Sequence, residues 1–349
     1  MKNISLKDLC DINVNLKLPS LSDLYNNLNS SHGINQDEIN NQKVNIITHH
    51  FDSSLYLIEQ FMRYINQSET LPFTLNPKIS VSDQRLLIQL EQVSRWLSEY
   101  KPFFQYSPYV DLFFRVTPSF PIMYSRKSNP REAFMGKSMA EWSNQFIEQI
   151  RLILHSRKFK DRIRHREENA RRSFSSSIRY VQHLFDRHSR LLVIRMDFAL
   201  RRDPNEKEEP LEKILVYFSQ LRIQMKRRVR VFDELVGYVA HLEYSLVKGH
   251  HLHAIFFFDG NRVKNAYRLS CLIARLWCRI TENQGIYFNT HVKTLQYICP
   301  ATGMIHRSDE KKRCCLAYVI WYITKLDQQL MYKYHDKQRV FFRGEIKEK

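Results

Sequence analysis

Residues 249–260 read Gly-His-His-Leu-His-Ala-Ile-Phe-Phe-Phe-Asp-Gly. An apolar run that begins at a glycine turn and ends at Asp-Gly predicts a β-strand. Successive side chains of a strand point to opposite faces, so His251 and His253 share one face with Ile255 and Phe257. We expect the other face, with Leu252, Ala254, Phe256 and Phe258, to be the buried one.

The segment just upstream, residues 236–247, also alternates between apolar and polar side chains. A tight turn around residues 247–249 would join the two runs into an antiparallel hairpin. If the turn is centred on Val247, Glu243 lies opposite His251 and His241 lies opposite His253. Such neighbours have Cβ atoms roughly 5 Å apart. Two histidines in a strand are often no more than paired polar residues, but the facing carboxylate favours a metal site made of His251, His253 and Glu243.

A second group of candidate residues lies near the C-terminus, in a predicted helix over residues 309–330. Tyr318, Tyr322 and Lys325 follow at i, i+4 and i+7 and therefore share one face of this helix. The aliphatic residues form a separate stripe, so this helix can pack against the core without burying the tyrosines. The ordinary alternative is that tyrosines on a helix are core residues or surface residues without a role. A phenol has a pKa of about 10 and needs a nearby cation to act as a nucleophile. Lys325 and a metal ion would supply it, and a phosphodiester is the electrophile that suits this set.

The remaining periodicity predicts an α+β fold with a mostly antiparallel central sheet, flanking helices on one face and an open polar face. We divide the chain into a helical N-terminal module of unknown role (residues 1–115), a connector with a basic helical segment (116–172) and the α+β domain (173–349). Strands are expected over residues 191–201, 236–247, 249–260, 286–292 and 304–307. Helices are expected over residues 46–65, 83–100, 141–172 (one helix or two), 173–186, 210–230, 263–280 and 309–330.

The charge is distributed unevenly along the 349 residues, which carry a net charge of +18. Residues 1–120 hold 10 basic and 12 acidic side chains, whereas residues 121–349 hold 44 basic and 24 acidic ones. An excess of this sign favours nucleic acid or an anionic membrane surface as partner, although a run of charges on a helix is often only a solvated face. The basic residues that we expect to contact DNA are Arg162, Arg166, Arg195, Arg201, Lys226, Arg227 and Arg228.

The sequence also argues against several classes of protein. No apolar run approaches the roughly 18 residues of a membrane span, and the first 20 residues do not resemble a signal peptide. The six cysteines include no Cys-x-x-Cys pair, so we expect reduced thiols and a soluble protein of the cytoplasm. No phosphate-binding Gly-x-x-x-x-Gly-Lys-Ser/Thr loop occurs, and duplex unwinding would require a partner.

These motifs resemble those of the HUH endonucleases that initiate rolling-circle replication. The resemblance rests on His251-Leu-His253, on Glu243 eight residues earlier and on Tyr322-Ile-Thr-Lys325. More narrowly, residues 174–344 are similar to the inovirus (filamentous phage) replication proteins and to the YagK/YfjJ-like C-terminal domain found in prophages. The resemblance implies Mg²⁺ or Mn²⁺ on His251, His253 and Glu243, and Tyr322 or Tyr318 as the nucleophile.

The activity implied by this resemblance is site-specific nicking and rejoining of single-stranded DNA at a replication origin. A 5′-phosphotyrosine intermediate would leave a free 3′-OH, and a host helicase and polymerase would be the partners. Two alternatives stay open: a noncatalytic prophage DNA-binding or regulatory protein on the same fold, and a single-strand HUH transposase. Residues 1–170 lie outside the resemblance.

Overall fold

The computed structural model describes residues 35–39, 42–46, 53–76, 78–102, 104–121, 129–201, 211–245, 249–289, 301–324, 330–331 and 339–346. The chain divides into two compact units. We call residues 51–169 with 326–336 the helical unit, and residues 1–50, 170–325 and 337–349 the sheet unit. Among the described residues, no helix is long and apolar enough to cross a membrane.

The helical unit is built around an aromatic core. Phe61, Trp96 and Phe113 contact one another with ring centroids 5.6 to 6.5 Å apart. Its helices are α3 (Ser53–Gln67), α4 (Gln84–Leu90), α5 (Val93–Leu97), α6 (Pro108–Val116), η1 (Thr117–Ser119) and α7 (Met139–His155). Its short strands are β3 (Phe73–Thr74) with β4 (Ser80–Val81), β5 (Gln105–Tyr106) with β13 (Leu330–Met331), and β6 (Ala133–Phe134) with β7 (Lys137–Ser138).

Helix α8 (Arg157–Arg187) contributes its first part to the helical unit and its second part to the sheet unit. The helix predicted to begin at Ser173 therefore begins 16 residues earlier, at Arg157. Helix α7 ends at His155, and the extended backbone of Ser156 (ψ 148°) separates the two helices.

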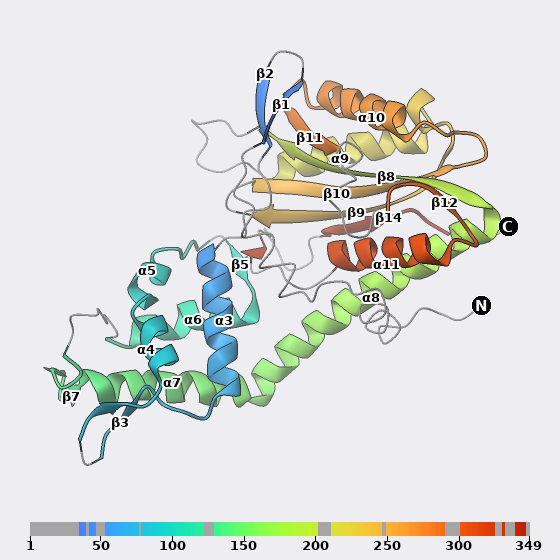
Figure 1. Cartoon of the computed structure of the whole chain (residues 1–349). Helices are drawn as coiled ribbons and strands as arrows, with labels where there is room; N and C mark the ends of the chain where they lie inside the picture. Colours follow the sequence, from blue (N-terminus) through green and yellow to red (C-terminus); the bar gives the residue numbers. More distant parts are fainter. Residues whose placement is uncertain are drawn as a thin grey trace. The chain divides into compact units, whose positions relative to one another are not determined.

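The sheet unit contains a six-stranded, antiparallel sheet, which confirms the predicted fold class (Figure 1). The strands are β8 (Arg190–Leu200), β9 (Leu235–Ser245), β10 (Gly249–Asp259), β11 (Gly285–Asn289), β12 (Gly303–His306) and β14 (Phe341–Arg343). Their order is β11-β8-β10-β9-β14, and β12 pairs with the start of β8 on the same edge as β11. A separate hairpin consists of β1 (Asn35–Ile39) and β2 (Gln42–Ile46).

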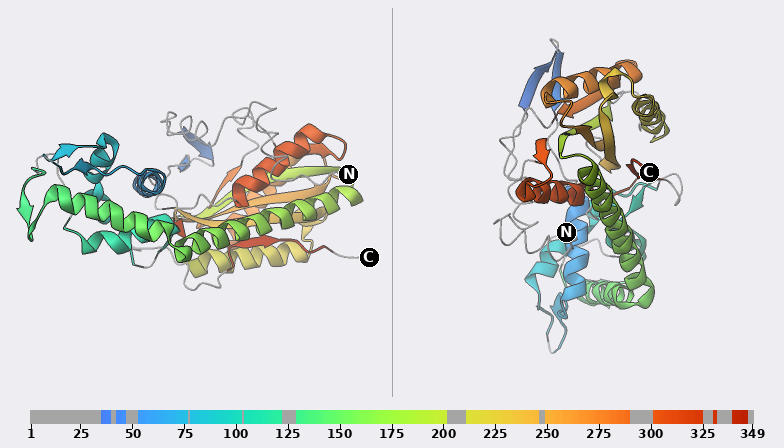
Figure 2. Two further views of the ribbon diagram at one scale, coloured as in Figure 1. Left: turned by 90° about the horizontal axis from the view of Figure 1, so that it is seen from below. Right: turned by 90° about the vertical axis from the view of Figure 1, so that its right-hand side faces the viewer.

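Helices cover both faces of this sheet, so the expected open polar face is wrong (Figures 1 and 2). Helices α9 (Leu211–Lys226) and α10 (Ala266–Ile280) pack on the face of Phe198 and Phe256, where Trp277 contacts Phe198. The end of α8 and helix α11 (Glu310–Thr324) pack on the face of Ile255 and Phe257. The apolar side chains that follow the two histidines along β10 are therefore covered by these helices, so this face of the sheet is buried as well.

The close approach of α8 to the sheet depends on a glycine. A Cβ atom at Gly237 of β9 would lie 2.7 Å from Cδ1 of Leu184 and would also overlap the hydroxyl of Tyr180. Burial raises the pKa of the Tyr180 phenol to about 12.

Cysteine chemistry differs from the expectation of reduced thiols. Cys271, Cys278 and Cys314 are free, but Cys315 on α11 is disulfide-bonded.

Candidate metal centre

The hairpin of β9 and β10 brings the candidate metal ligands together. Its predicted register is confirmed, because His251 lies opposite Glu243 and His253 lies opposite His241. One ligand atom each from Glu243, His251 and His253 lies within 4.8 Å of the other two. Antiparallel pairing thus converts residues spread over 11 positions of sequence into one compact donor set.

The carboxylate of Glu243 lies between the two imidazoles. Its Oε2 atom is 3.3 Å from Nε2 of His251 and 3.0 Å from Nε2 of His253. The two rings are perpendicular, with centroids 4.9 Å apart. His241 approaches the same carboxylate more distantly, with Nδ1 3.7 Å from Oε1. Both Nε2 atoms therefore face the position where a cation would bind.

Oxygen atoms on the other side of each ring fix the orientation of the imidazoles. Nδ1 of His253 is 2.6 Å from Oδ1 of Asp197, and Nδ1 of His251 is 3.1 Å from the carbonyl oxygen of Gly249. A proton on each Nδ1 satisfies these acceptors and leaves Nε2 to bind a metal ion. Asp197 was not among the predicted site residues, although it lies on a predicted strand.

The electrostatics of the site favour a bound cation. Burial disfavours the charged carboxylate, but the charge of His253 and hydrogen bonds from three histidines hold the pKa of Glu243 well below its usual range. Burial also opposes a charged His253, yet Asp197 and Glu243 raise the pKa of this histidine to about 9. The two carboxylates thus favour a positive charge at this position, which a bound metal ion would also supply.

The donor set fits a divalent ion that accepts nitrogen and oxygen ligands. Two imidazoles and one carboxylate suit Mn²⁺ and related ions, and three protein ligands leave coordination positions for a substrate. The side chain of Glu243 is 21% exposed, whereas those of His251 and His253 are 7% and 1% exposed. The open side of the site is therefore the side of the carboxylate.

Tyr322 lies on the same face of the sheet as the metal centre and packs against the cluster that contains Ile255 and Phe257. The guanidinium carbon of Arg195 is 5.6 Å from the centroid of its ring. Nε of Arg195 is 3.8 Å from Oδ1 of Asp197, the oxygen that contacts His253. Contacts therefore connect Tyr322 through Arg195 and Asp197 to His253, a candidate metal ligand.

The second tyrosine has different surroundings. The ring of Tyr318 packs against Trp321, with centroids 5.7 Å apart, and burial raises the pKa of its phenol. Lys325, the predicted lysine of this motif, lies outside the described residues.

The cations expected to contact DNA do not form one group. Arg195 is buried within the metal centre, and Arg201 is exposed directly after β8, at the end of the sheet where His251 lies. Arg162 and Arg166 belong to the helical unit, where Arg162 binds Asp111 at 3.0 Å.

The cluster Lys226, Arg227 and Arg228 is exposed at the end of α9. Arg228 donates a hydrogen bond to the carbonyl of Asp233, which lies two residues before Leu235, the residue of β9 that pairs with Phe258. The strand from His251 to Phe258 spans roughly 23 Å, so this cluster and the metal centre lie at opposite ends of the hairpin.

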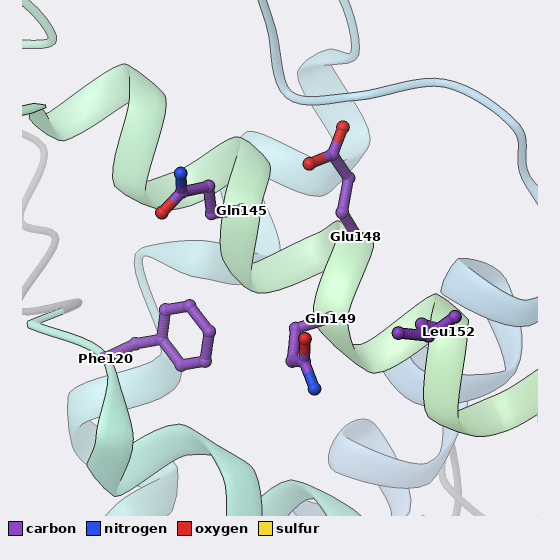
Figure 3. Close-up of a pocket in the computed structure, with 5 residues that line it drawn as sticks. All are labelled: Phe120, Gln145, Glu148, Gln149 and Leu152. Carbon is purple, nitrogen blue, oxygen red and sulfur yellow. The ribbon is translucent and has the colours of Figure 1, made fainter.

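A pocket of about 410 Å³ lies in the helical unit. Figure 3 shows its lining residues, which are Phe120, Gln145, Glu148, Gln149 and Leu152. The pocket contains one charged side chain and shares no residue with the metal centre.

Comparison with known proteins identifies the family. The model of the YagK/YfjJ C-terminal domain matches residues 155–344, so the match begins before residue 174, where the resemblance was expected to start. No curated protein and no solved structure matches the chain. Because the match extends over more than half of the 349 residues and includes the whole metal centre, the chain belongs to the YagK/YfjJ C-terminal domain family, a family of prophage-associated proteins.

Proposed function

We propose that the protein initiates rolling-circle replication as a metal-dependent, site-specific endonuclease and ligase of single-stranded DNA. The observation that carries the proposal is the chain of contacts from Tyr322 through Arg195 and Asp197 to His253. A tyrosine, a cation and a candidate metal-binding set thereby lie on one face of one sheet. This combination suits attack on a phosphodiester.

Each part has a defined chemical role in this proposal. A divalent ion held by Glu243, His251 and His253 would act as a Lewis acid on the scissile phosphate. The phenolic oxygen of Tyr322 forms a bond to phosphorus, and the bond from phosphorus to the 3′ oxygen breaks. The electron pair stays on the 3′ oxygen, which takes a proton from water, while the phenolic proton passes to water.

The products are a 5′-phosphotyrosine and a free 3′-OH. The reverse reaction restores the phosphodiester, so the covalent intermediate preserves the bond energy for rejoining. The 3′-OH would serve a host polymerase, and a host helicase would separate the strands, since the sequence has no phosphate-binding loop of its own.

The test is covalent capture of DNA. Labelled single-stranded oligonucleotides, tiled across the replicon that encodes the chain, are incubated with the full-length protein and Mn²⁺ and separated on a denaturing gel. We expect an adduct that EDTA prevents and that is lost in Tyr322→Phe and in the double variant His251→Gln/His253→Gln. The variant Tyr217→Phe, a change on α9 away from the metal centre, is the control that retains the adduct.

Two other results would overturn the proposal. Tight binding without cleavage or adduct would identify a noncatalytic DNA-binding protein on the same fold. Cleavage confined to the ends of a mobile element, with none at a replication origin, would identify a single-strand transposase.

A further inference from the structure

Helix α11 offers two tyrosines one helical turn apart, and the proposed reaction needs one nucleophile. Their surroundings differ in charge. The ring of Tyr322 lies beside the guanidinium of Arg195, whereas the ring of Tyr318 packs against Trp321. The difference bears on which hydroxyl group can be ionised and held in place.

Arg195 is a buried cation. Its relative exposure is 8%, and it lies on β8 opposite Ile255, two residues before Asp197. A buried charge is stable only when it is paired, and Asp197, at 3.8 Å, provides the opposite charge. The same carboxylate contacts His253, so the position of Arg195 is tied to that of the metal ligands.

A guanidinium held in this way has two effects on a neighbouring tyrosine. It attracts the electron-rich face of the ring, which restrains the orientation of the side chain. It also favours the negative charge that develops on the phenolic oxygen during attack. Burial raises the pKa of the Tyr318 phenol, and the neighbouring ring of Trp321 carries no charge.

We infer that Arg195 is the positioning residue that holds Tyr322 beside the metal centre, and that Tyr322 rather than Tyr318 forms the bond to phosphorus. This inference rests on the proposed function, because it assigns roles within that reaction. In this assignment Arg195 orients Tyr322 and does not itself contact the phosphate.

The experiment combines kinetics with a measurement that needs no activity. Adduct formation is followed as a function of pH in the full-length wild type, Arg195→Gln, Arg195→Lys, Tyr318→Phe and Tyr322→Phe. The matched control is Arg190→Gln, which removes an arginine at the other end of β8 that binds Asn261. Fluorine NMR of protein labelled with fluorotyrosine reports on each ring, with signals assigned by their loss in the two Tyr→Phe variants.

We expect Tyr322→Phe to abolish the adduct and Tyr318→Phe to retain it. In Arg195→Gln the pH profile should move to higher pH by about one unit, with a rate about tenfold lower at neutral pH. Arg195→Lys keeps the charge and should keep the profile near that of the wild type, as should Arg190→Gln. The fluorine signal of Tyr322, and not that of Tyr318, should shift in Arg195→Gln.

The possible failures are distinct. An adduct lost in Tyr318→Phe but kept in Tyr322→Phe would overturn the assignment of the nucleophile and leave the proposed function standing. A lower rate in Arg195→Gln, without any shift of the pH profile or of the fluorine signal of Tyr322, would show that Arg195 has only a structural role. If the wild type forms no adduct, the proposed function and this inference both fail. If Arg195→Gln does not fold, Arg195→Lys decides: a pH profile near that of the wild type supports the role of the charge, and a shift to higher pH overturns it.

Discussion

At the level of single residues, Asp197 has the largest expected effect outside the three metal ligands. Its carboxylate contacts Nδ1 of His253 at 2.6 Å and so fixes the orientation of that ring. Asparagine in its place has no charge to hold the Nδ1 proton. We expect Asp197→Asn to weaken Mn²⁺ binding about 10- to 100-fold, measured by isothermal titration calorimetry.

The control for this prediction is Asp186→Asn, an exposed carboxylate on α8 whose hydrogen bond is to Gln182. It removes the same charge from the sheet unit without touching the site. Equal Mn²⁺ affinity in wild type and Asp197→Asn would show that Asp197 does not support the metal ligands.

The residues of this site differ in how well the sequence predicts them. Glu243, His251 and His253 belong to one hairpin, so a short turn sets their register and local alternation suffices to pair them. Asp197 and Arg195 come from β8, which is separated from β9 by helix α9. The pairing of β8 with β10 is a long-range contact, and no local pattern specifies that Asp197 faces His253.

At the level of elements, burial is harder to predict than secondary structure. The strand β10 shows the predicted alternation, yet it is buried on both faces along nearly its whole length. Two histidines in the alternating pattern indicated an exposed face. The cover comes from α8, which ends 62 residues before the strand begins, and from α11, which begins 51 residues after the strand ends. Alternation identifies the two faces of a strand, but distant helices decide whether each is covered.

The start of helix α4 gives a prediction on pH. Asp83 caps this helix, accepting hydrogen bonds from the amides of Arg85 and Leu86 at 2.9 and 3.0 Å, and it also accepts from Tyr64 and Thr70. Burial opposes the charged form, but these donors together keep the pKa of Asp83 below its ordinary value. The carboxylate therefore stabilises the fold above the unfolded-state pKa of about 3.9, and this stabilisation is lost as the pH falls through the lower, folded-state pKa.

We expect Asp83→Ala to destabilise α4 by roughly 1 to 2 kcal/mol at neutral pH and to remove part of the acid sensitivity of this helix. Hydrogen exchange of the α4 amides in the full-length chain, measured from neutral to acidic pH, checks both effects. Asp161→Ala on α8, which removes an exposed ion pair with Arg164, is the control. Equal protection of α4 in wild type and Asp83→Ala at neutral pH would contradict the capping role.

At the level of the whole molecule, the sequence indicated three segments, whereas contacts divide the chain into two units. The predicted boundary at residue 173 lies within α8, which is one continuous helix. Helical periodicity continues through this point, so no composition signal marks the change of unit. The segment 326–336 belongs to the helical unit although residues of the sheet unit precede and follow it in sequence, and only tertiary pairing such as that of β13 with β5 places it there.

All three candidate metal ligands belong to the sheet unit, so a metal ion bound to them should stabilise that unit selectively. A ligand that binds only the folded state at about 100 times its Kd adds about 2.7 kcal/mol to the free energy of unfolding. Hydrogen exchange of the full-length protein should therefore slow in β8, β9 and β10 when Mn²⁺ is added, with little change in α3 and α6. The double variant His251→Gln/His253→Gln should show no such gain. A ligand stabilises only the part of the structure that must unfold before the ligand is released. If Mn²⁺ slowed hydrogen exchange equally in both units, or still slowed it in the double variant, the metal would therefore bind elsewhere.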